Sequence, residues 1–228
     1  MRMVREATSR YGIYLLNSLN PFRLEGQKSI VLEALQQLRW RAPDWIVVPG
    51  GNLGNTSALG KALREALAAS LIDQMPRVAV AQAAGAAPFY RAWQSGFRDY
   101  APVEAETVAS AIRIGDPVNY TKARRVVVDT EGAVTAVDDA AIMAAKASVD
   151  RAGIGCEPAS AAGLAGIRRL VAEGVIQPGE RVLTYLTGHL LKDTEASADY
   201  YITHAGEEQP LVIDPTLEAL DRAIVDLL

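Results

Sequence analysis

The feature that most constrains the fold is a short apolar segment followed directly by a glycine-rich one. Trp45-Ile46-Val47-Val48 is partly β-branched, and Pro49-Gly50-Gly51-Asn52-Leu53-Gly54-Asn55-Thr56 comes immediately after it. A buried strand that ends in a loop has this pattern. Apolar residues at helical spacing follow from about Thr56. This part of the chain therefore predicts a strand, a loop and a helix in succession.

Strands and helices are expected to alternate along the rest of the chain. Three further apolar runs predict strands at residues 77–81, 134–137 and 181–186. Helical spacing, with capping residues at the ends, predicts helices at residues 25–40, 138–152 and 159–173, and another that begins at Asp214-Pro215. This alternation predicts an α/β fold with a mainly parallel sheet flanked by helices. The segment from Trp93 to Val103 has no period and is expected to be a surface loop.

Composition argues against several kinds of protein. The 228 residues are 50% hydrophobic, which is enough for a sizeable core, and no apolar run is long enough to span a membrane. The net charge of -4 comes from interspersed acidic and basic residues, which argues against a nucleic-acid partner. Cys156 is the single cysteine, so an intramolecular disulfide is excluded and a structural metal is not expected. A cytoplasmic protein with a small anionic ligand fits these features.

The glycine-rich segment is a candidate phosphate site. Small residues between a strand and a helix let backbone N–H groups surround an anion, and the helix dipole adds positive potential. The alternative is a tight turn whose glycines are needed for positive φ. The segment has no Gly-Lys-Ser/Thr, and its glycines at 50, 51 and 54 miss the dinucleotide-binding spacing.

Several segments, in order along residues 10 to 195, resemble threonine synthases among the fold-type II pyridoxal-phosphate enzymes. The longest is Asn17-Ser18-Leu19-Asn20-Pro21-Phe22-Arg23-Leu24-Glu25-Gly26-Gln27-Lys28. The others are Gly50 to Asn55, Ala111-Ile112-Arg113-Ile114-Gly115, Cys156 to Ala162, and Leu186-Thr187-Gly188-His189 with Leu191-Lys192-Asp193. The resemblance implies the large α/β domain of such an enzyme at residues 25–228, with residues 1–24 as a remnant of the smaller domain and a linker.

The resemblance also implies binding roles. The cofactor, pyridoxal 5'-phosphate, would be held by Gly51, Asn52, Leu53, Gly54 and Asn55 around its phosphate and by Thr187 at its pyridine nitrogen. Asn17, Ser18 and Arg23 would bind the phosphate of the substrate, O-phosphohomoserine, since a guanidinium suits a phosphate dianion. From the residues alone, Thr187 could equally be a hydroxyl that satisfies local backbone at a strand end, and Asn20-Pro21 a polar turn.

The lysine that forms the Schiff base in this family is expected to be missing. The resemblance places it in a Ser-Phe-Lys-Asp-like motif upstream of the segments matched here, and none of Lys28, Lys61, Lys122, Lys146 and Lys192 stands in such a motif. His189 and His204 are expected to take no part in chemistry, and Glu157 to Ser160 to be structural. The family's reaction converts O-phosphohomoserine and water to threonine and phosphate. The chain alone is therefore expected to be inactive, with a separate N-terminal lobe chain as a candidate partner and a homo-oligomer as another.

Two other functions remain open. One is a non-catalytic module that binds pyridoxal phosphate or another phosphorylated ligand. The other is a different fold-type II lyase, of the threonine dehydratase or cysteine synthase type. Two residues depart from the family pattern, Asp116 in place of asparagine and Leu190 in place of glycine, and both are expected to alter the pocket wall near Thr187.

Overall fold

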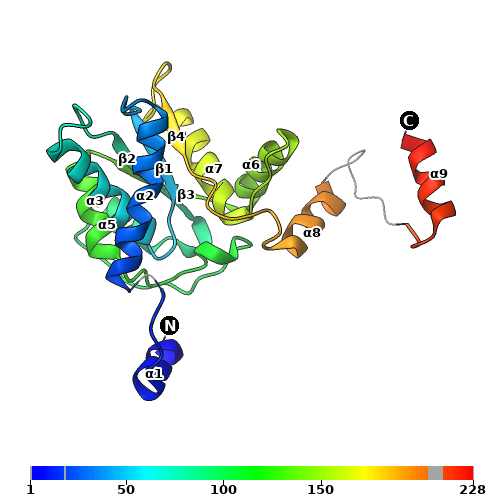
Figure 1. Cartoon of the computed structure of the whole chain (residues 1–228), viewed down its shortest axis with the longest axis horizontal. Helices are drawn as coiled ribbons and strands as arrows, with labels where there is room; N and C mark the ends of the chain where they lie inside the picture. Colours follow the sequence, from blue (N-terminus) through cyan, green and yellow to red (C-terminus); the bar gives the residue numbers. More distant parts are fainter. Residues whose placement is uncertain (1, 18, 205–212, 228) are drawn as a thin grey trace. The chain divides into compact units, whose positions relative to one another are not determined.

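The computed structural model describes residues 2–17, 19–204 and 213–227 (Figure 1). The chain divides into two compact units, Met1–Lys192 and Asp193–Leu228. None of the described helices is long and apolar enough to cross a membrane. The boundary expected at residue 24 falls inside the first unit and stays a prediction.

The first unit is built on a four-stranded sheet. Its strands are β1 (Trp45–Pro49), β2 (Arg77–Ala83), β3 (Ala133–Val137) and β4 (Val182–Thr184), in the order β3-β2-β1-β4. All neighbouring strands run parallel. The predicted α/β class with a parallel sheet is therefore confirmed, and the four strands lie where the sequence places them.

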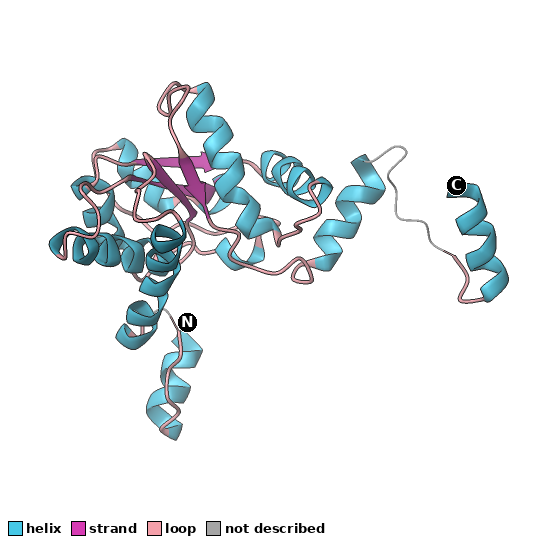
Figure 2. Cartoon of the chain, turned by 45° about the horizontal axis from the view of Figure 1, so that its top comes forward, coloured by secondary structure: helices cyan, strands magenta, loops and turns pink. Residues whose placement is uncertain are grey.

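Helices cover both faces of this sheet, as Figure 2 shows. Helices α2 (Pro21–Gln37), α3 (Gly54–Ala68) and α5 (Tyr120–Asp129) supply one face, because their apolar side chains cluster with Ile46 and Val48 of β1. Helix α7 (Pro158–Ala172) covers the other face, where its Leu170 packs with Trp45 and Val47. Helix α6 (Asp139–Arg151) packs against α7. Alternate residues of β1 thus point to opposite layers, as a buried parallel strand requires.

Helix α7 lies close to the sheet because two of its residues have no side chain. A Cβ on Gly166 would come 2.5 Å from the Cβ of Ala81, and one on Gly163 would come 2.5 Å from the Oγ1 of Thr184. Both contacts are shorter than carbon or oxygen atoms tolerate without a shift. This close approach holds α7 against the sheet, and Ala159 in its first turn lines the cavity at the sheet edge.

Most helix ends follow the sequence signals. Asp138 accepts a hydrogen bond from the amide of Ala141 at 2.7 Å and caps α6. Gly153 and Gly174 follow α6 and α7 with φ of 74° and 69°, the left-handed conformation that glycine adopts readily. The predicted start of α2 at residue 25 is wrong. The helix begins at Pro21, and its cap is Asn20, whose side chain accepts from the amide of Phe22.

Other elements differ from the prediction in extent. Helix α4 (Pro88–Gln94) takes in Trp93, so the irregular segment begins only after Gln94. Two short 3₁₀ helices, η1 (Ala84–Ala86) and η2 (Ser110–Ile112), and helix α1 (Arg2–Tyr11) complete the first unit. Strand β4 pairs only with β1, and their pairing ends at Val47 and Thr184. The predicted strand at residues 181–186 is therefore too long.

The second unit contains two described helices, α8 (Thr194–His204) and α9 (Leu217–Leu227). The sequence predicts that Asp214 caps the last helix and that Pro215 is its first residue. Instead, α9 begins at Leu217, and the hydroxyl of Thr216 accepts from the amide of Ala219 at 3.2 Å. Threonine is also among the preferred capping residues, and here it caps the helix two residues after the predicted aspartate.

Candidate functional site

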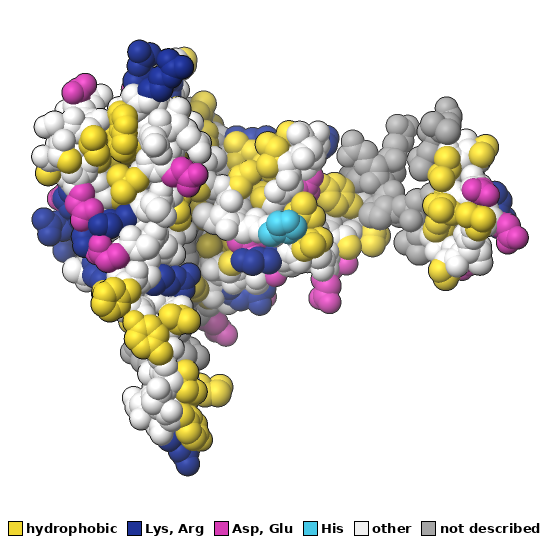
Figure 3. Space-filling model, viewed as in Figure 1, with side chains coloured by type: hydrophobic (Ala, Val, Ile, Leu, Met, Phe, Trp, Pro, Cys, Tyr) yellow, Lys and Arg dark blue, Asp and Glu magenta, His cyan; other side chains and the backbone are white. Residues whose placement is uncertain are grey.

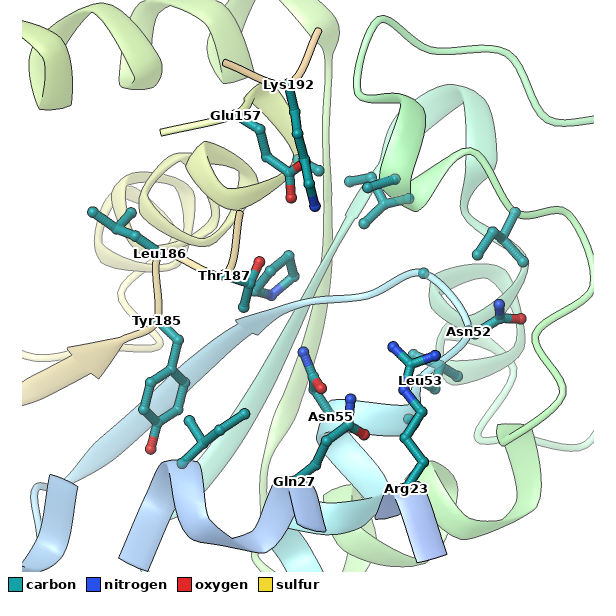
Figure 4. Close-up of a pocket in the computed structure, with 18 of the residues that line it drawn as sticks. Arg23, Gln27, Asn52, Leu53, Asn55, Glu157, Tyr185, Leu186, Thr187 and Lys192 are labelled. Atoms are coloured by element: carbon teal, nitrogen blue, oxygen red, sulfur yellow. The ribbon is translucent and has the colours of Figure 1, made fainter. Parts of the chain in front are cut away.

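A cavity of about 600 Å³ opens where β1 and β4 end at their carboxyl side. Ligand sites of open parallel sheets lie at this edge, because the loops that follow the strands converge there. The lining comes from α2, the β1–α3 loop, η2, the start of α7 and the segment after β4 (Figure 4). Its residues are Asn17, Arg23, Gln27, Ile30, Pro49, Gly51, Asn52, Leu53, Gly54, Asn55, Ala111, Ile112, Ile114, Glu157, Ala159, Tyr185, Leu186, Thr187 and Lys192.

The glycine-rich loop forms one wall of this cavity. A Cβ on Gly51 would meet the carbonyl oxygen of Ala111 at 3.1 Å, and a Cβ on Gly50 would come 2.5 Å from a methyl group of Val80. Gly50, Gly51 and Gly54 do not have positive φ, so the alternative of a tight turn that needs glycine for positive φ is wrong. Leu53 has the left-handed conformation instead, with φ of 61°. The glycines are needed because backbone passes close to backbone and side chains, and not because the turn is left-handed.

The loop leads directly into α3. The helix begins at Gly54 without a side-chain cap, and Gly54 and Asn55 line the cavity. The backbone amide of Asn119 donates to the backbone carbonyl oxygen of Asn52 at 3.2 Å. The side-chain Oδ1 of Asn52 is buried without a hydrogen-bond partner. The uncapped helix start leaves backbone N–H groups that favour an anionic ligand. The Oδ1 of Asn52 is an acceptor, so it needs a hydrogen-bond donor such as water.

Thr187 lies on the opposite wall in a small hydrogen-bonded network. Its hydroxyl oxygen lies 3.1 Å from the hydroxyl oxygen of Ser160, which is buried at the start of α7. Ser160 also accepts from the amide of Gly188 at 2.8 Å, and Gly188 accepts through its carbonyl from the amide of Glu157. These bonds join the segment after β4 to α7, so the position of Thr187 is set by two elements.

Glu157 and Lys192 form an ion pair at the same wall. The Nζ of Lys192 lies 3.6 Å from the Oε2 of Glu157, and Figure 4 shows both side chains directed toward the cavity. The Glu157 side chain is 4% exposed and that of Lys192 is 61% exposed. The sequence assigns Glu157 a structural role and finds no Schiff-base motif at Lys192. Their contact joins residues 35 positions apart and becomes visible only in the folded chain.

Helix α2 contributes the polar groups of the third wall. Figure 4 shows Arg23 and Gln27 directed from this helix toward the glycine-rich loop. The side-chain Oε1 of Gln27 is buried and has no hydrogen-bond partner. Asn17 lies in the lining and accepts from the amide of Leu19 at 2.9 Å. Ser18, which the sequence groups with them, lies outside the described residues.

A group of four charged side chains joins α2 to α3 beside this wall. The Nζ of Lys28 lies 2.6 Å from Glu65 and 2.8 Å from Glu25, and Lys61 also pairs with Glu25. Hydrogen bonds from Lys28 and then Lys61 lower the pKa of Glu25, and those to Glu25 and Glu65 raise the pKa of Lys28. Each pair is exposed enough that it adds little stability alone.

The two departures from the family pattern lie outside the cavity lining. The hydroxyl of Tyr100 donates to Asp116 at 2.6 Å, and burial together with this bond raises the pKa of Tyr100. Leu190 packs against Gly155, where a Cβ would come 2.6 Å from its Cδ2. Asp116 therefore supports a loop, and Leu190 supports the turn that leads to Glu157.

The cavity thus brings together the described residues that the sequence singles out, and it adds Gln27, Glu157, Tyr185 and Lys192. Of the five lysines, all within the described ranges, Lys192 alone is among the lining residues. His189 accepts from the amide of Leu191 and is absent from the lining.

Comparison with known proteins identifies similar chains. A family model described as "Pyridoxal-phosphate dependent enzyme" matches residues 1–188. The chain is 45% identical to the threonine synthase of Methanosarcina acetivorans over 226 residues. This match covers 98% of this chain and 54% of that protein. It is 41% identical to the threonine synthase of Methanocaldococcus jannaschii over 227 residues, and this match covers 99% of this chain and 55% of that protein. The chain spans about half the length of these curated relatives.

A solved structure has the same arrangement of elements. The crystal structure of threonine synthase from Escherichia coli superposes with a TM-score of 0.66 at 25% sequence identity. The superposition covers 97% of this chain and 48% of that one. The parallel sheet and its flanking helices are therefore the fold of fold-type II enzymes, of which this chain contains about half.

Proposed function

Because the chain belongs to the family of pyridoxal-phosphate dependent enzymes, we propose that its cavity binds pyridoxal 5'-phosphate. The observation that carries the proposal is that the glycine-rich loop and Thr187 face one cavity from opposite walls. The phosphate would be held by Gly51, Asn52, Leu53, Gly54 and Asn55, with the helix dipole of α3 behind them. The hydroxyl of Thr187 would bond the pyridine nitrogen. The bound cofactor supplies the electron-withdrawing ring that the family's chemistry needs.

Two observations support the fit of these residues to the cofactor. The close approach of Gly51 to Ala111 leaves the loop backbone, and not a side chain, at the wall. Thr187 is held in place by Ser160. The residues therefore suit the phosphate and the ring.

We propose further that the chain serves a threonine synthase reaction, in which O-phosphohomoserine and water give threonine and phosphate. The similarity to threonine synthases along nearly the whole chain supports this substrate. Arg23 and Asn17, with Ser18, would bind the substrate phosphate at the α2 wall, since a guanidinium offers paired donors to phosphate oxygens. These residues would fix the substrate, and the walls would exclude bulk water.

We propose that the 228-residue chain alone does not turn over, because none of its lysines stands in the family's Schiff-base motif. Activity would need the remaining region of the enzyme, which a separate polypeptide could supply. The cytoplasm is the compartment we propose, and a homo-oligomer is an additional proposal for its assembly.

The test is a pair of measurements on the purified chain. Equilibrium dialysis with 4'-deoxypyridoxine 5'-phosphate, which has the ring and phosphate but no aldehyde, should give one site per chain that inorganic phosphate displaces. Thr187→Val should weaken this binding, whereas Thr203→Val, on α8 in the second unit, should not. Phosphate release from O-phosphohomoserine by the chain alone should be at background. Absence of the displaceable site would refute cofactor binding, and clear turnover would refute the proposed inactivity.

A further inference from the structure

We propose that Lys192 is a covalent attachment site for an aldehyde that carries a phosphate, pyridoxal 5'-phosphate above all. The inference rests on the proposed function, since the glycine-rich loop would hold the phosphate while Lys192 reacts with the aldehyde. No Schiff-base motif marks this lysine, although it stands in the matched segment Leu191-Lys192-Asp193. Its position in the fold marks it instead, because Lys192 is the one lysine among the residues that line the cavity, and all five lysines lie in the described ranges.

The other lysines are engaged away from the cavity or lie on the outer surface. Lys28 and Lys61 pair with glutamates between α2 and α3. Lys146 is buried on α6 and pairs with Asp150 at 2.6 Å. Lys122 is exposed on α5 and does not contribute to the lining. An aldehyde bound in the cavity would therefore meet the amine of Lys192 before that of another lysine.

The local contacts of Lys192 leave its amine free to move. Its side chain is 61% exposed, and the ion pair to Glu157 is longer than a hydrogen bond at 3.6 Å. An ion pair with one exposed partner restrains a side chain only weakly. A long, flexible lysine stem can thus turn further into the cavity without loss of packed contacts.

Glu157 gives the product a counter-ion. The amine nitrogen of Lys192 forms a bond to the aldehyde carbon, and the aldehyde oxygen leaves as water. Starting from the ammonium form, the product is a protonated imine and one water, so the positive charge stays on nitrogen and no proton is lost overall. The Oε2 of Glu157 is buried and accepts no hydrogen bond, and the Glu157 side chain is only 4% exposed. The carboxylate balances the positive charge on nitrogen before and after the reaction, so the imine forms without leaving a buried charge unpaired.

The experiment incubates the purified chain with pyridoxal 5'-phosphate, reduces it with borohydride and maps the modified lysine by peptide mass spectrometry. We expect one adduct per chain, at Lys192, with excess inorganic phosphate lowering its yield at least tenfold. Lys192→Met should lower the total yield by a similar factor, while Lys122→Met should leave it unchanged.

Binding of 4'-deoxypyridoxine 5'-phosphate, which cannot form an imine, separates this inference from the proposed function. If the analogue binds but the adduct maps to other lysines or spreads evenly over them, the role of Lys192 is refuted and the cofactor site stands. If the analogue does not bind, the proposed function fails and the attachment site fails with it. Circular dichroism of Lys192→Met checks that this exposed substitution leaves the fold intact.

Discussion

The hydroxyl of Ser160 lies 3.1 Å from the hydroxyl of Thr187 and joins the start of α7 to the segment after β4. Ser160 has no exposed surface and also accepts from the amide of Gly188. One buried side chain therefore sets the position of the proposed ring contact and satisfies a backbone donor. Its loss should affect both binding and stability.

Ser160→Ala should destabilise the chain by about 0.5–1.5 kcal/mol, because the half-buried amide of Gly188 and the hydroxyl of Thr187 lose a hydrogen-bond partner. Binding of 4'-deoxypyridoxine 5'-phosphate should weaken as well. Urea unfolding and equilibrium dialysis measure the two effects. Ser29→Ala is the matched control, since that hydroxyl donates to the carbonyl of Gly26 at an exposed position. Equal effects of the two substitutions would show that Ser160 has no special role.

Gly51→Ala should weaken phosphate binding more strongly than it weakens the fold. Its Cβ would meet the carbonyl of Ala111 at 3.1 Å and the Cα of Ile112 at 3.2 Å, so the loop would have to shift at the cavity wall. Gly26→Ala is the control, because a Cβ there meets nothing within 4 Å, and alanine should stabilise α2 by up to about 1 kcal/mol. Phosphate competition against the bound analogue measures the loss. Unchanged competition in Gly51→Ala would contradict the proposed phosphate site.

Arg23→Gln should lower the affinity for O-phosphohomoserine by about 10- to 100-fold, since a charge-assisted hydrogen bond contributes roughly 1.5–3 kcal/mol. Arg23→Lys should recover part of this loss, because it keeps the charge without the paired donors. Arg125→Gln, on the outer side of α5, should have no effect. Titration calorimetry on the cofactor-loaded chain gives the affinities. If neither Arg23→Gln nor Arg23→Lys changes the substrate affinity, the substrate phosphate binds elsewhere.

Cys156 should be unreactive in the folded chain. Burial raises the pKa of its thiol to about 11, so the reactive thiolate is scarce and also shielded. Thiol reagents at pH 8 should label the chain only after unfolding. Rapid labelling of the folded chain would contradict this.

The same pKa shift predicts a dependence of stability on pH. Between the ordinary pKa of 9.0 and about 11, the folded thiol keeps its proton while the unfolded one loses it. The thiol's contribution is therefore constant below pH 9 and declines as the pH rises toward 11, by roughly 1–3 kcal/mol. The difference in unfolding free energy between the wild type and Cys156→Ala isolates this contribution from other groups. A difference that stays constant over this range would refute the shift.

The sequence predicts the sheet and most of its helices because their signals are local. The apolar run at Trp45 marks a buried strand, and the glycines after α6 and α7 mark the ends of those helices. Each of these signals lies within the segment that it specifies. Helix α3 begins two residues earlier than predicted because Leu53 has a left-handed conformation. This conformation is uncommon for residues other than glycine, so a leucine in the sequence does not predict it. Strand β4 ends early because its pairing with β1 stops at Thr184, and the apolar run that continues beyond it carries no signal of where pairing stops.

The candidate site is only partly predictable from the sequence. Motifs identify the glycine-rich loop, Thr187 and Arg23, whose convergence in one cavity is a property of the fold. Glu157 and Lys192 meet only because the segment after β4 returns to the start of α7. Pairs that depend on such tertiary contacts have no signature in spacing or periodicity.

The charged group between α2 and α3 has a practical consequence for anyone who handles this chain. Lys28 links Glu25 of the helix that carries Arg23 to Glu65 of the helix that begins with the glycine-rich loop. Ionic strength screens exposed pairs of this kind, and the screening length falls from about 10 Å at 0.1 M to about 3 Å at 1 M. High salt during purification and crystallisation would therefore weaken these ion pairs, while the apolar packing of Val31 and Leu35 against Leu63 keeps the two helices together, and low-salt, phosphate-free buffers would preserve the pairs.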